Sequence, residues 1–369
     1  MGISGFPIEG RAPGWVDSTR RWLGVVELLI RFKALGFTLV MPLLGAATAS
    51  AYPGLAGNKV PALIGAALSY HLFSYILNDV IDLPVDRTEP LRADYPLVKG
   101  LIEPWQALGL ALVQIPLAGV FTAVAGGSYQ AYVILGASFA LMAAYNVWGK
   151  RSIFPPVTDL IQGLAWGGLT LYGAAATTDS SRFTFHVSPL TVLSVSYVAI
   201  FIVMINGIHG SVRDLANDLR CGLRTTAIRL GARSRPGGGI DVTPRLAWYT
   251  LALQAILIAL PVLALTNNWL DYAPWELAVT WVSMLAVALA SVGLLAIAAR
   301  SGSDARTLFV CGSLHLVLSF GALLVLFGFY LDKVLLFVVF AAYVGPLLAS
   351  GLLHSGLAQA WRKVKRGRL

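Results

Sequence analysis

Residues 52–87 read YPGLAGNKVPALIGAALSYHLFSYILNDVIDLPVDR, an apolar run that ends among carboxylates. The apolar part is long enough to cross the roughly 30 Å hydrocarbon layer of a membrane as a helix. Its end carries Asp79, Asp82 and Asp86 together with Asn78. Because ionised carboxylates are costly beside lipid and usually mark a functional site, this stretch predicts a transmembrane helix with a polar site at one end.

The composition of the whole chain extends this prediction. The chain has 369 residues, of which 57% are hydrophobic and 12% charged, with a mean hydropathy of +0.73. Soluble domains are about 25% charged, so we expect an all-α, polytopic transmembrane helical bundle of about ten helices. The expected spans are 34–51, 61–80, 105–126, 129–148, 156–177, 188–210, 246–267, 276–299, 307–330 and 334–357.

The basic residues predict how this bundle is oriented. If both termini are cytoplasmic, the segments expected on the cytoplasmic side hold 24 of the 27 Lys and Arg residues. This is the distribution that the positive-inside rule describes. The net charge of +9 is then explained by topology and by contact with anionic membrane lipid, so it does not call for a nucleic-acid partner.

A second acidic pair, Asp214 and Asp218, follows the sixth expected span, whereas most of the 18 acidic residues are scattered in loops. The two residues are four positions apart and share one face of a helix. Asp79, Asp82 and Asp86 follow an i, i+3, i+7 pattern and share a face in the same way. Like charges at these spacings repel each other, and a hard divalent cation such as Mg²⁺ suits such a set of oxygen ligands. Spans two and six run in the same direction, so both clusters are expected at the cytoplasmic side.

Basic residues flank both acidic clusters: Arg87, Lys99, Lys150, Arg151, Arg213, Arg220 and Arg224. Carboxylates, a divalent metal and flanking cations together are typical of a diphosphate site, and the apolar helices beside it would enclose a long apolar tail. An ion-coupled transporter is the alternative from another functional class, because buried acids also bind Na⁺ or H⁺. Transporter sites lie near the middle of the bilayer, whereas these acids are expected at its rim.

Three motifs carry a resemblance to a known family. The first is Asn78-Asp79-x-x-Asp82-x-x-x-Asp86-Arg87, followed by Pro96-Leu97-x-x-Gly100. The second is Arg213-Asp214-x-x-x-Asp218-x-x-x-Gly222-x-x-Thr225, and the third is Tyr145 followed by Lys150-Arg151. In type, order and helix position these motifs resemble those of the UbiA superfamily of intramembrane prenyltransferases, over roughly residues 20–300.

The resemblance implies a function and a set of site residues. It implies that Mg²⁺ and an isoprenyl diphosphate bind together, and that the prenyl group passes to a lipophilic, usually aromatic, acceptor. The implied catalytic residues are Asp79, Asp82, Asp214, Asp218, Lys150 and Tyr145. The implied substrate-binding residues are Asn78, Arg87, Lys99, Arg151, Arg213 and Arg224, and the implied metal ligands are Asn78, Asp79, Asp82, Asp86, Asp214 and Asp218. A terpene cyclase of the same superfamily would use the same aspartates without an acceptor, and the motifs do not separate the two.

The chain departs from the family pattern at three places. Tyr95 stands where the family often has Arg, which leaves Arg92 or Lys99 to supply that charge. Pro84 lies inside the first motif and predicts a kink before Asp86. The tenth span is additional to the nine that the family commonly has.

The sequence predicts three regions. Residues 1–33 are expected to be a cytoplasmic N-terminus with an interfacial amphipathic helix at 15–33. Residues 34–330 are expected to form the UbiA-like catalytic domain, and residues 331–369 an extra helix with a basic tail. The Gly- and Pro-rich stretch 231–244 is expected to be a flexible loop within the catalytic domain.

Overall fold

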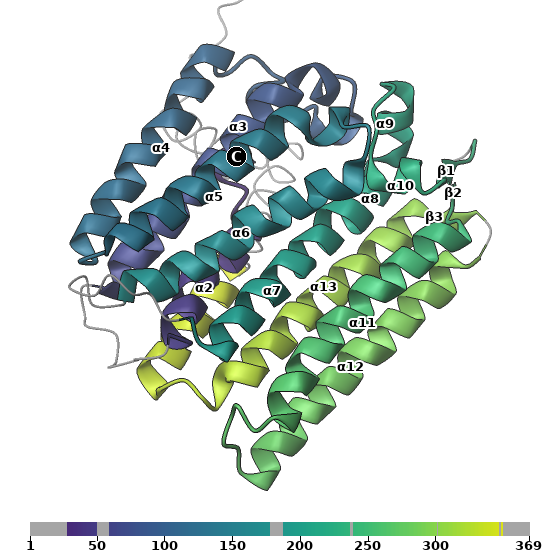
Figure 1. Cartoon of the computed structure of the whole chain (residues 1–369). Coiled ribbons are helices and arrows are strands. Elements are labelled where there is room, and N and C mark those ends of the chain that lie inside the picture. The colour runs from purple at the N-terminus through teal and green to yellow at the C-terminus, as the bar shows by residue number, and fades with distance from the viewer. Residues whose placement is uncertain are drawn as a thin grey trace, which may run out of the picture.

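The chain folds into a bundle of long helices, as the composition predicts (Figure 1). The structure is a computed structural model that describes residues 28–49, 59–177, 187–236, 239–300, 302–346 and 348–349. Its long helices are α2 (Phe32–Ala47), α3 (Lys59–Asp86), α4 (Pro104–Val124), α5 (Tyr129–Trp148), α6 (Pro155–Thr177), α7 (Pro189–Met204), α11 (Pro244–Thr266), α12 (Pro274–Ala298) and α13 (Ala305–Gly328). A shorter apolar helix follows at Lys333–Pro346.

The apolar sequence of these helices makes this an integral, multi-pass membrane protein. Seven helices of the described residues are long and apolar enough to cross a membrane, and α2 and Lys333–Pro346 are shorter apolar helices. Within the described residues, each of the ten expected spans overlaps a helix, and the end of the tenth span lies outside these residues. That all ten cross the membrane, with both termini on the cytoplasmic side, stays a prediction.

The helix boundaries follow from local chemistry. Helices α4, α7, α11 and α12 begin at a proline, which suits the first helical turn because its nitrogen needs no hydrogen-bond partner there. Side-chain oxygens cap three helices by accepting a hydrogen bond from the backbone N–H three residues later, at Ser128, Ser188 and Thr243. Helix α3 continues through Pro84 and ends at Asp86.

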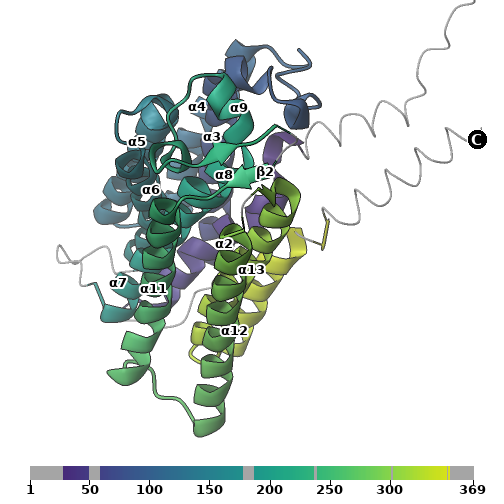
Figure 2. The ribbon, with the colours of Figure 1, turned by 90° about the vertical axis from the view of Figure 1, so that its right-hand side faces the viewer.

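The helices pack so that α2 lies inside the bundle, against α3, α6 and α7. Helix α3 also packs on α4, α5 packs on α6, and α12 packs on α13. Figure 2, turned by 90°, shows α11, α12 and α13 running side by side, with α8 (Ser211–Arg213) and α9 (Leu215–Arg220) gathered at one end of the bundle. The helical segment η1 (Pro90–Arg92) follows the end of α3.

The stretch 231–244 is not the plain loop that its composition predicts. It contains strands β1 (Arg233–Ser234) and β2 (Gly239–Asp241), and β2 also pairs with β3 (Ser303–Asp304) to form a small antiparallel sheet. Asp241 stabilises this sheet by pairing with Arg235 at 2.7 Å and by accepting a hydrogen bond from the Gly302 N–H at 2.8 Å. The contact between Asp241 and Gly302 joins residues 61 positions apart, so local composition does not reveal it. Most of the expected amphipathic helix at 15–33, and the basic tail, lie outside the described residues.

Candidate active site

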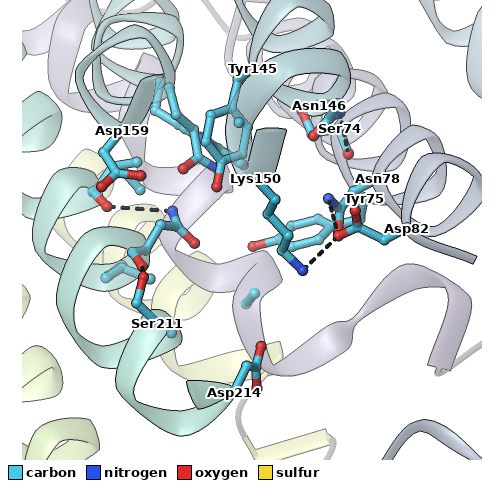
Figure 3. A pocket seen from close by; sticks show the side chains of 18 of the residues that line it. Ser74, Tyr75, Asn78, Asp82, Tyr145, Asn146, Lys150, Asp159, Ser211 and Asp214 are labelled. Atoms are coloured by element: carbon cyan, nitrogen blue, oxygen red, sulfur yellow. Dashed lines mark hydrogen bonds and ion pairs between the residues drawn. The ribbon is translucent and has the colours of Figure 1, made fainter. Parts of the chain in front are cut away.

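A cavity of about 300 Å³ lies between α2, α3, α5, α6, α7 and the segment that follows α7. Figure 3 shows side chains from these elements converging on it. Part of its lining is charged and part is apolar, the latter including Phe37, Met142 and Trp166. The cavity therefore has the two environments that a substrate with an anionic head and an apolar tail requires.

The three aspartates of the first cluster are buried at the end of α3, and each has a different cationic partner. Asp79 pairs with Arg31. Asp82 pairs with Nζ of Lys150 at 2.9 Å and accepts a hydrogen bond from Nδ2 of Asn78 at 3.2 Å. Of these acidic residues, Asp82 lines the cavity.

Asp86 completes the first cluster by pairing with Arg92. Its oxygen lies 2.6 Å from the guanidinium, and both side chains are buried. Because α3 stays helical through Pro84, Asp86 shares the buried face of α3 with Asp79 and Asp82 instead of hanging from the loop beyond.

The second cluster lines the opposite wall of the cavity. The π-helical segment η3 (Ile205–Gly210) follows α7, and Asp214 sits at the junction between α8 and α9. The guanidinium of Arg213 binds both carboxylate oxygens of Asp214, at 2.6 and 2.8 Å. Burial alone would raise the pKa of Asp214, but the hydrogen bonds and charge of Arg213 hold it below its ordinary value. Burial raises the pKa of Asp218 to about 6.

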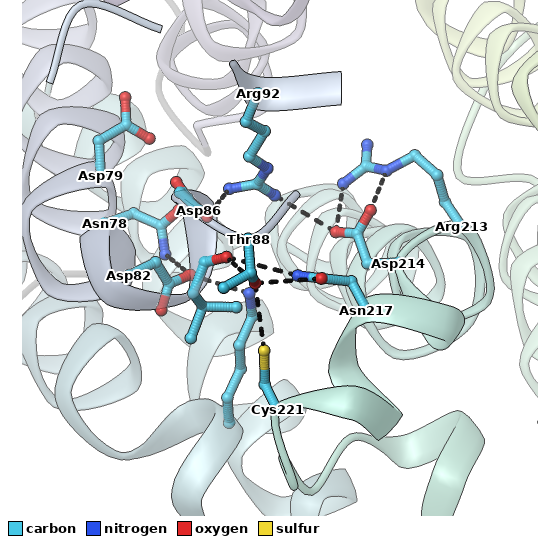
Figure 4. Close-up of polar contacts among 12 residues, drawn as sticks. Asn78, Asp79, Asp82, Asp86, Thr88, Arg92, Arg213, Asp214, Asn217 and Cys221 are labelled. Carbon is cyan, nitrogen blue, oxygen red and sulfur yellow. Dashed lines mark hydrogen bonds and ion pairs between the residues drawn. The ribbon is translucent and has the colours of Figure 1, made fainter. Parts of the chain in front are cut away.

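Arg92 joins the two clusters (Figure 4). Its guanidinium contacts Asp86 at 2.6 Å and Asp214 at 3.3 Å. The ring of Tyr95 lies against this group, with its centre 5.8 Å from Cζ of Arg92 and 5.5 Å from Cζ of Arg31. The position where the family often has Arg thus holds an aromatic ring that contacts two arginines, and Arg92, rather than Lys99, reaches the cavity.

A second set of contacts holds the end of α3 against α9. Oγ1 of Thr88 donates to Oδ1 of Asn217 at 3.1 Å, and Nδ2 of Asn217 donates to the carbonyl of Val85 at 3.4 Å. Thr88 also lies 3.3 Å from the sulfur of Cys221. The two acidic clusters are therefore brought together by their supporting segments as well as by Arg92.

The structure separates the other predicted site residues into two groups. Asn78, Tyr145, Lys150, Arg213, Arg224, Asp214 and Asp218 line the cavity together with Asp82. Arg87, Lys99 and Arg151 are exposed and lie outside its lining. Lys99 instead pairs with the exposed Asp94 at 2.6 Å, so the substrate-binding role predicted for these three residues gains no support from their positions.

Sequence reasoning missed several polar residues of the cavity. Arg31 lines it from the start of α2, and Asp159 and Gln162 line it from α6. Asp159 was recognisable, because it is a lone carboxylate inside an expected span, and such residues are usually functional. Arg31 carries no comparable sequence signal, since basic residues before a first span are ordinary topology signals.

The donor set fits a magnesium ion that is shared with a phosphate ligand. Among the described residues, no three His, Cys, Asp or Glu side chains gather closely enough to hold a metal ion. Mg²⁺ needs one or two carboxylates when waters and substrate phosphates complete its octahedron. Asp82 and Asp218 face the cavity and can supply them, and the assignment of all six predicted residues as ligands stays a prediction.

Residues 39–300 match the sequence profile of the UbiA prenyltransferase family. The chain is 26% identical over 215 residues to the mitochondrial 4-hydroxybenzoate polyprenyltransferase of Arabidopsis thaliana, across 58% of this chain and 50% of the relative. The chain thus spans about half the length of that curated relative.

Solved structures share the fold. The apo structure of a UbiA homolog from Aeropyrum pernix has a TM-score of 0.58 at 19% identity and covers 82% of this chain and 98% of its own. A UbiA homolog from Archaeoglobus fulgidus bound to DMAPP and Mg²⁺ has a TM-score of 0.56 at 14% identity, with coverages of 81% and 98%.

Proposed function

The chain belongs to the UbiA prenyltransferase family, and from this premise we propose that it is a Mg²⁺-dependent membrane prenyltransferase. In this proposal it ionises an isoprenyl diphosphate and transfers the prenyl group to a lipophilic aromatic acceptor. The observation that carries the proposal is the meeting of two acidic segments, from α3 and from the α8–α9 junction, around a cavity with both cationic and apolar walls.

The charged wall suits a diphosphate. Lys150, Arg213 and Arg224 present cations to the cavity, and Arg92 adds a guanidinium that is already oriented by two carboxylates. Mg²⁺, held by Asp82 and Asp218, would neutralise charge on the leaving diphosphate. Preoriented cations of this kind stabilise charge that develops on a leaving group without having to reorganise during the reaction.

The apolar wall suits an isoprenyl chain and its allylic cation. Phe37, Met142, Ile202 and Trp166 line this part of the cavity. An aromatic face attracts positive charge, so Trp166 is placed to stabilise a cation that has left its diphosphate.

The relatives support the same chemistry. The curated relative is named for prenyl transfer to 4-hydroxybenzoate, and the Archaeoglobus structure contains DMAPP and Mg²⁺. A terpene cyclase remains the alternative within the family.

The test is an assay of the purified protein with Mg²⁺, geranyl diphosphate and 4-hydroxybenzoate or a hydroquinone as acceptor. We expect an acceptor-dependent prenylated product by mass spectrometry, and its loss when EDTA removes the metal. Asp82→Asn and Asp218→Asn should each lower turnover about 10²-fold or more, the usual effect of removing one electrostatic element of an active site.

Asp94→Asn is the matched control, because Asp94 is exposed and outside the cavity lining. Formation of a cyclic hydrocarbon without any acceptor would show that the protein is a terpene cyclase and not a transferase. Undiminished turnover in both active-site variants would refute the proposed site.

A further inference from the structure

Asp159 is a buried carboxylate that the ionisation step does not use. It lies on α6, is 6% exposed and lines the cavity. Its Oδ2 accepts a hydrogen bond from Oγ1 of Thr226. Within the described part of the chain, its Oδ1 accepts no hydrogen bond and the carboxylate forms no ion pair. Asp159 therefore has an acceptor oxygen left for a ligand in the cavity.

The surrounding backbone leaves room for this carboxylate. A Cβ atom at Gly207, in the π-helical segment η3, would lie 2.6 Å from Oδ2 of Asp159. Any other residue at position 207 would therefore push the carboxylate away from Thr226. π-Helical segments are frequent at functional sites, and here the glycine of the segment leaves the space that the carboxylate occupies.

Gln162 is a second polar residue of α6 that lines the cavity and has an unsatisfied acceptor. It is 9% exposed, and its buried Oε1 has no hydrogen-bond partner among the described residues. Asp159, Gln162 and Trp166 follow an i, i+3, i+7 pattern along one face of α6. Figure 3 shows Asp159 and Tyr145 pointing toward the same space.

These groups select for a ligand that donates hydrogen bonds. Asp159 and Gln162 both offer acceptor oxygens, whereas the cations that would bind a diphosphate come from other elements, including Lys150 after α5 and Arg213 in α8. An ionised diphosphate has no donor and is repelled by a carboxylate, and an isoprenyl chain has no polar group. The groups on α6 therefore suit the second substrate and require that it carry hydroxyl groups.

We propose that Asp159 binds a hydroxyl group of an aromatic acceptor and is the base that takes its proton. This inference rests on the proposed transferase function and assigns a further catalytic residue to it. The C1–O bond of the prenyl diphosphate breaks, and its electron pair leaves with the diphosphate. A ring carbon ortho or para to the hydroxyl forms a bond to C1, while the hydroxyl proton passes to Oδ1 of Asp159. The resulting dienone loses its ring proton to solvent and regains the hydroxyl proton from Asp159, which restores both the aromatic ring and the carboxylate.

The test compares Asp159→Asn with the wild type, using 1,4-dihydroxynaphthalene, hydroquinone and 4-hydroxybenzoate as acceptors and their O-methyl ethers as controls. For at least one of the three we expect prenylation of the free hydroxyl compound and no product from the methyl ether. In Asp159→Asn, kcat/KM for that acceptor should fall about 10²-fold or more, the usual contribution of a general base. Binding of geranyl diphosphate to Asp159→Asn should stay unchanged, which also shows that the variant is folded.

Calorimetric binding of the same acceptor supplies a readout that does not depend on turnover. Asp159→Ala, which removes the acceptor oxygens that Asn would partly keep, should weaken binding of the hydroxyl compound to the level of its methyl ether, and Asp94→Asn should leave both unchanged. Prenylation of the methyl ethers, or wild-type kinetics in Asp159→Asn, would overturn the role of Asp159 while leaving the transferase function intact. Diphosphate release with no acceptor-dependent product in the wild type would instead overturn the proposed function, and this inference with it.

Discussion

At the scale of single residues, Arg92 belongs to none of the three family motifs, yet it contacts both acidic clusters. Its side chain is 10% exposed. One carboxylate partner, Asp86 on α3, lies 6 positions from it in the chain, and the other, Asp214 beyond α7, lies 122 positions from it. Without Arg92, Asp86 would lose the cation that it pairs with, whereas Asp214 would keep its ion pair with Arg213. Arg92 therefore acts both as a structural bridge and as a preoriented cation of the diphosphate site.

Replacement of Arg92 should affect stability and substrate binding together. Arg92→Ala leaves Asp86 buried and without its cation, and removal of one partner of a buried ion pair costs about 3–5 kcal/mol. We expect a lower thermal unfolding midpoint of the purified protein and weaker binding of geranyl diphosphate.

Arg245→Ala is the matched control, because Arg245 is exposed on α11. If Arg92→Ala unfolds at the wild-type temperature, the bridge does not contribute to stability.

At the scale of elements, the position of α2 depends on its close approach to α6. A Cβ atom at Gly45 would lie 1.7 Å from the carbonyl oxygen of Thr170, and one at Gly173 would lie 1.9 Å from that of Pro42. Both contacts are with backbone, which cannot move aside as a side chain can. Small residues at such crossings allow membrane helices to pack closely, and here the crossing brings α2 and Arg31 to the cavity wall.

Gly173→Ala should therefore destabilise the bundle. The added methyl group must separate the two helices, and overpacking of this kind costs about 1–3 kcal/mol or more. The measurement is the thermal midpoint in detergent, together with the amount of monodisperse protein.

Gly109→Ala on α4 is the comparison, because nothing lies within 4 Å of a Cβ atom at that position. It should be neutral or stabilising by up to about 1 kcal/mol, as helix propensity favours Ala over Gly. Equal midpoints for the two variants would show that the α2–α6 crossing tolerates separation.

At the scale of the whole molecule, α8 and α9, which contribute Arg213 and Asp218 to the cavity lining, lie at one end of the bundle (Figure 2). The distribution of Lys and Arg predicts that this end faces the cytoplasm. Cys221 can report on which side of the membrane this end lies, because it follows α9. The thiols of Cys221 and Cys311 are both free and partly exposed.

Cysteine labelling in intact cells tests this orientation. In a Cys311→Ser background, Cys221 should react with a membrane-impermeant maleimide only after the membrane is permeabilised. Asn267→Cys in a chain without the two native cysteines should react in intact cells, because Asn267 is exposed in the turn after α11, at the opposite end of that helix. Labelling of Cys221 before permeabilisation would show that the protein has the opposite orientation in the membrane.

The sequence predicted the parts of this protein that depend on local pattern. The length of the apolar segments predicted helices, and within the described residues each expected span overlaps one. The physical reason is that a segment that crosses lipid must satisfy its backbone hydrogen bonds internally. The spacing of Asp79, Asp82 and Asp86 placed them on one buried face of α3, as found. The motifs indicated the UbiA family, which the family profile confirms.

The sequence by itself therefore determined the class of fold, the helices and the two acidic segments, since periodicity and hydropathy act over a few neighbouring residues. Only the tertiary structure decided which charges meet. It paired Asp79 with Arg31, placed Arg92 between Asp86 and Asp214, and turned Asp159 toward the cavity while leaving Lys99 outside. These contacts join residues from 6 to 122 positions apart, and their geometry depends on how the helices cross, which no local pattern encodes.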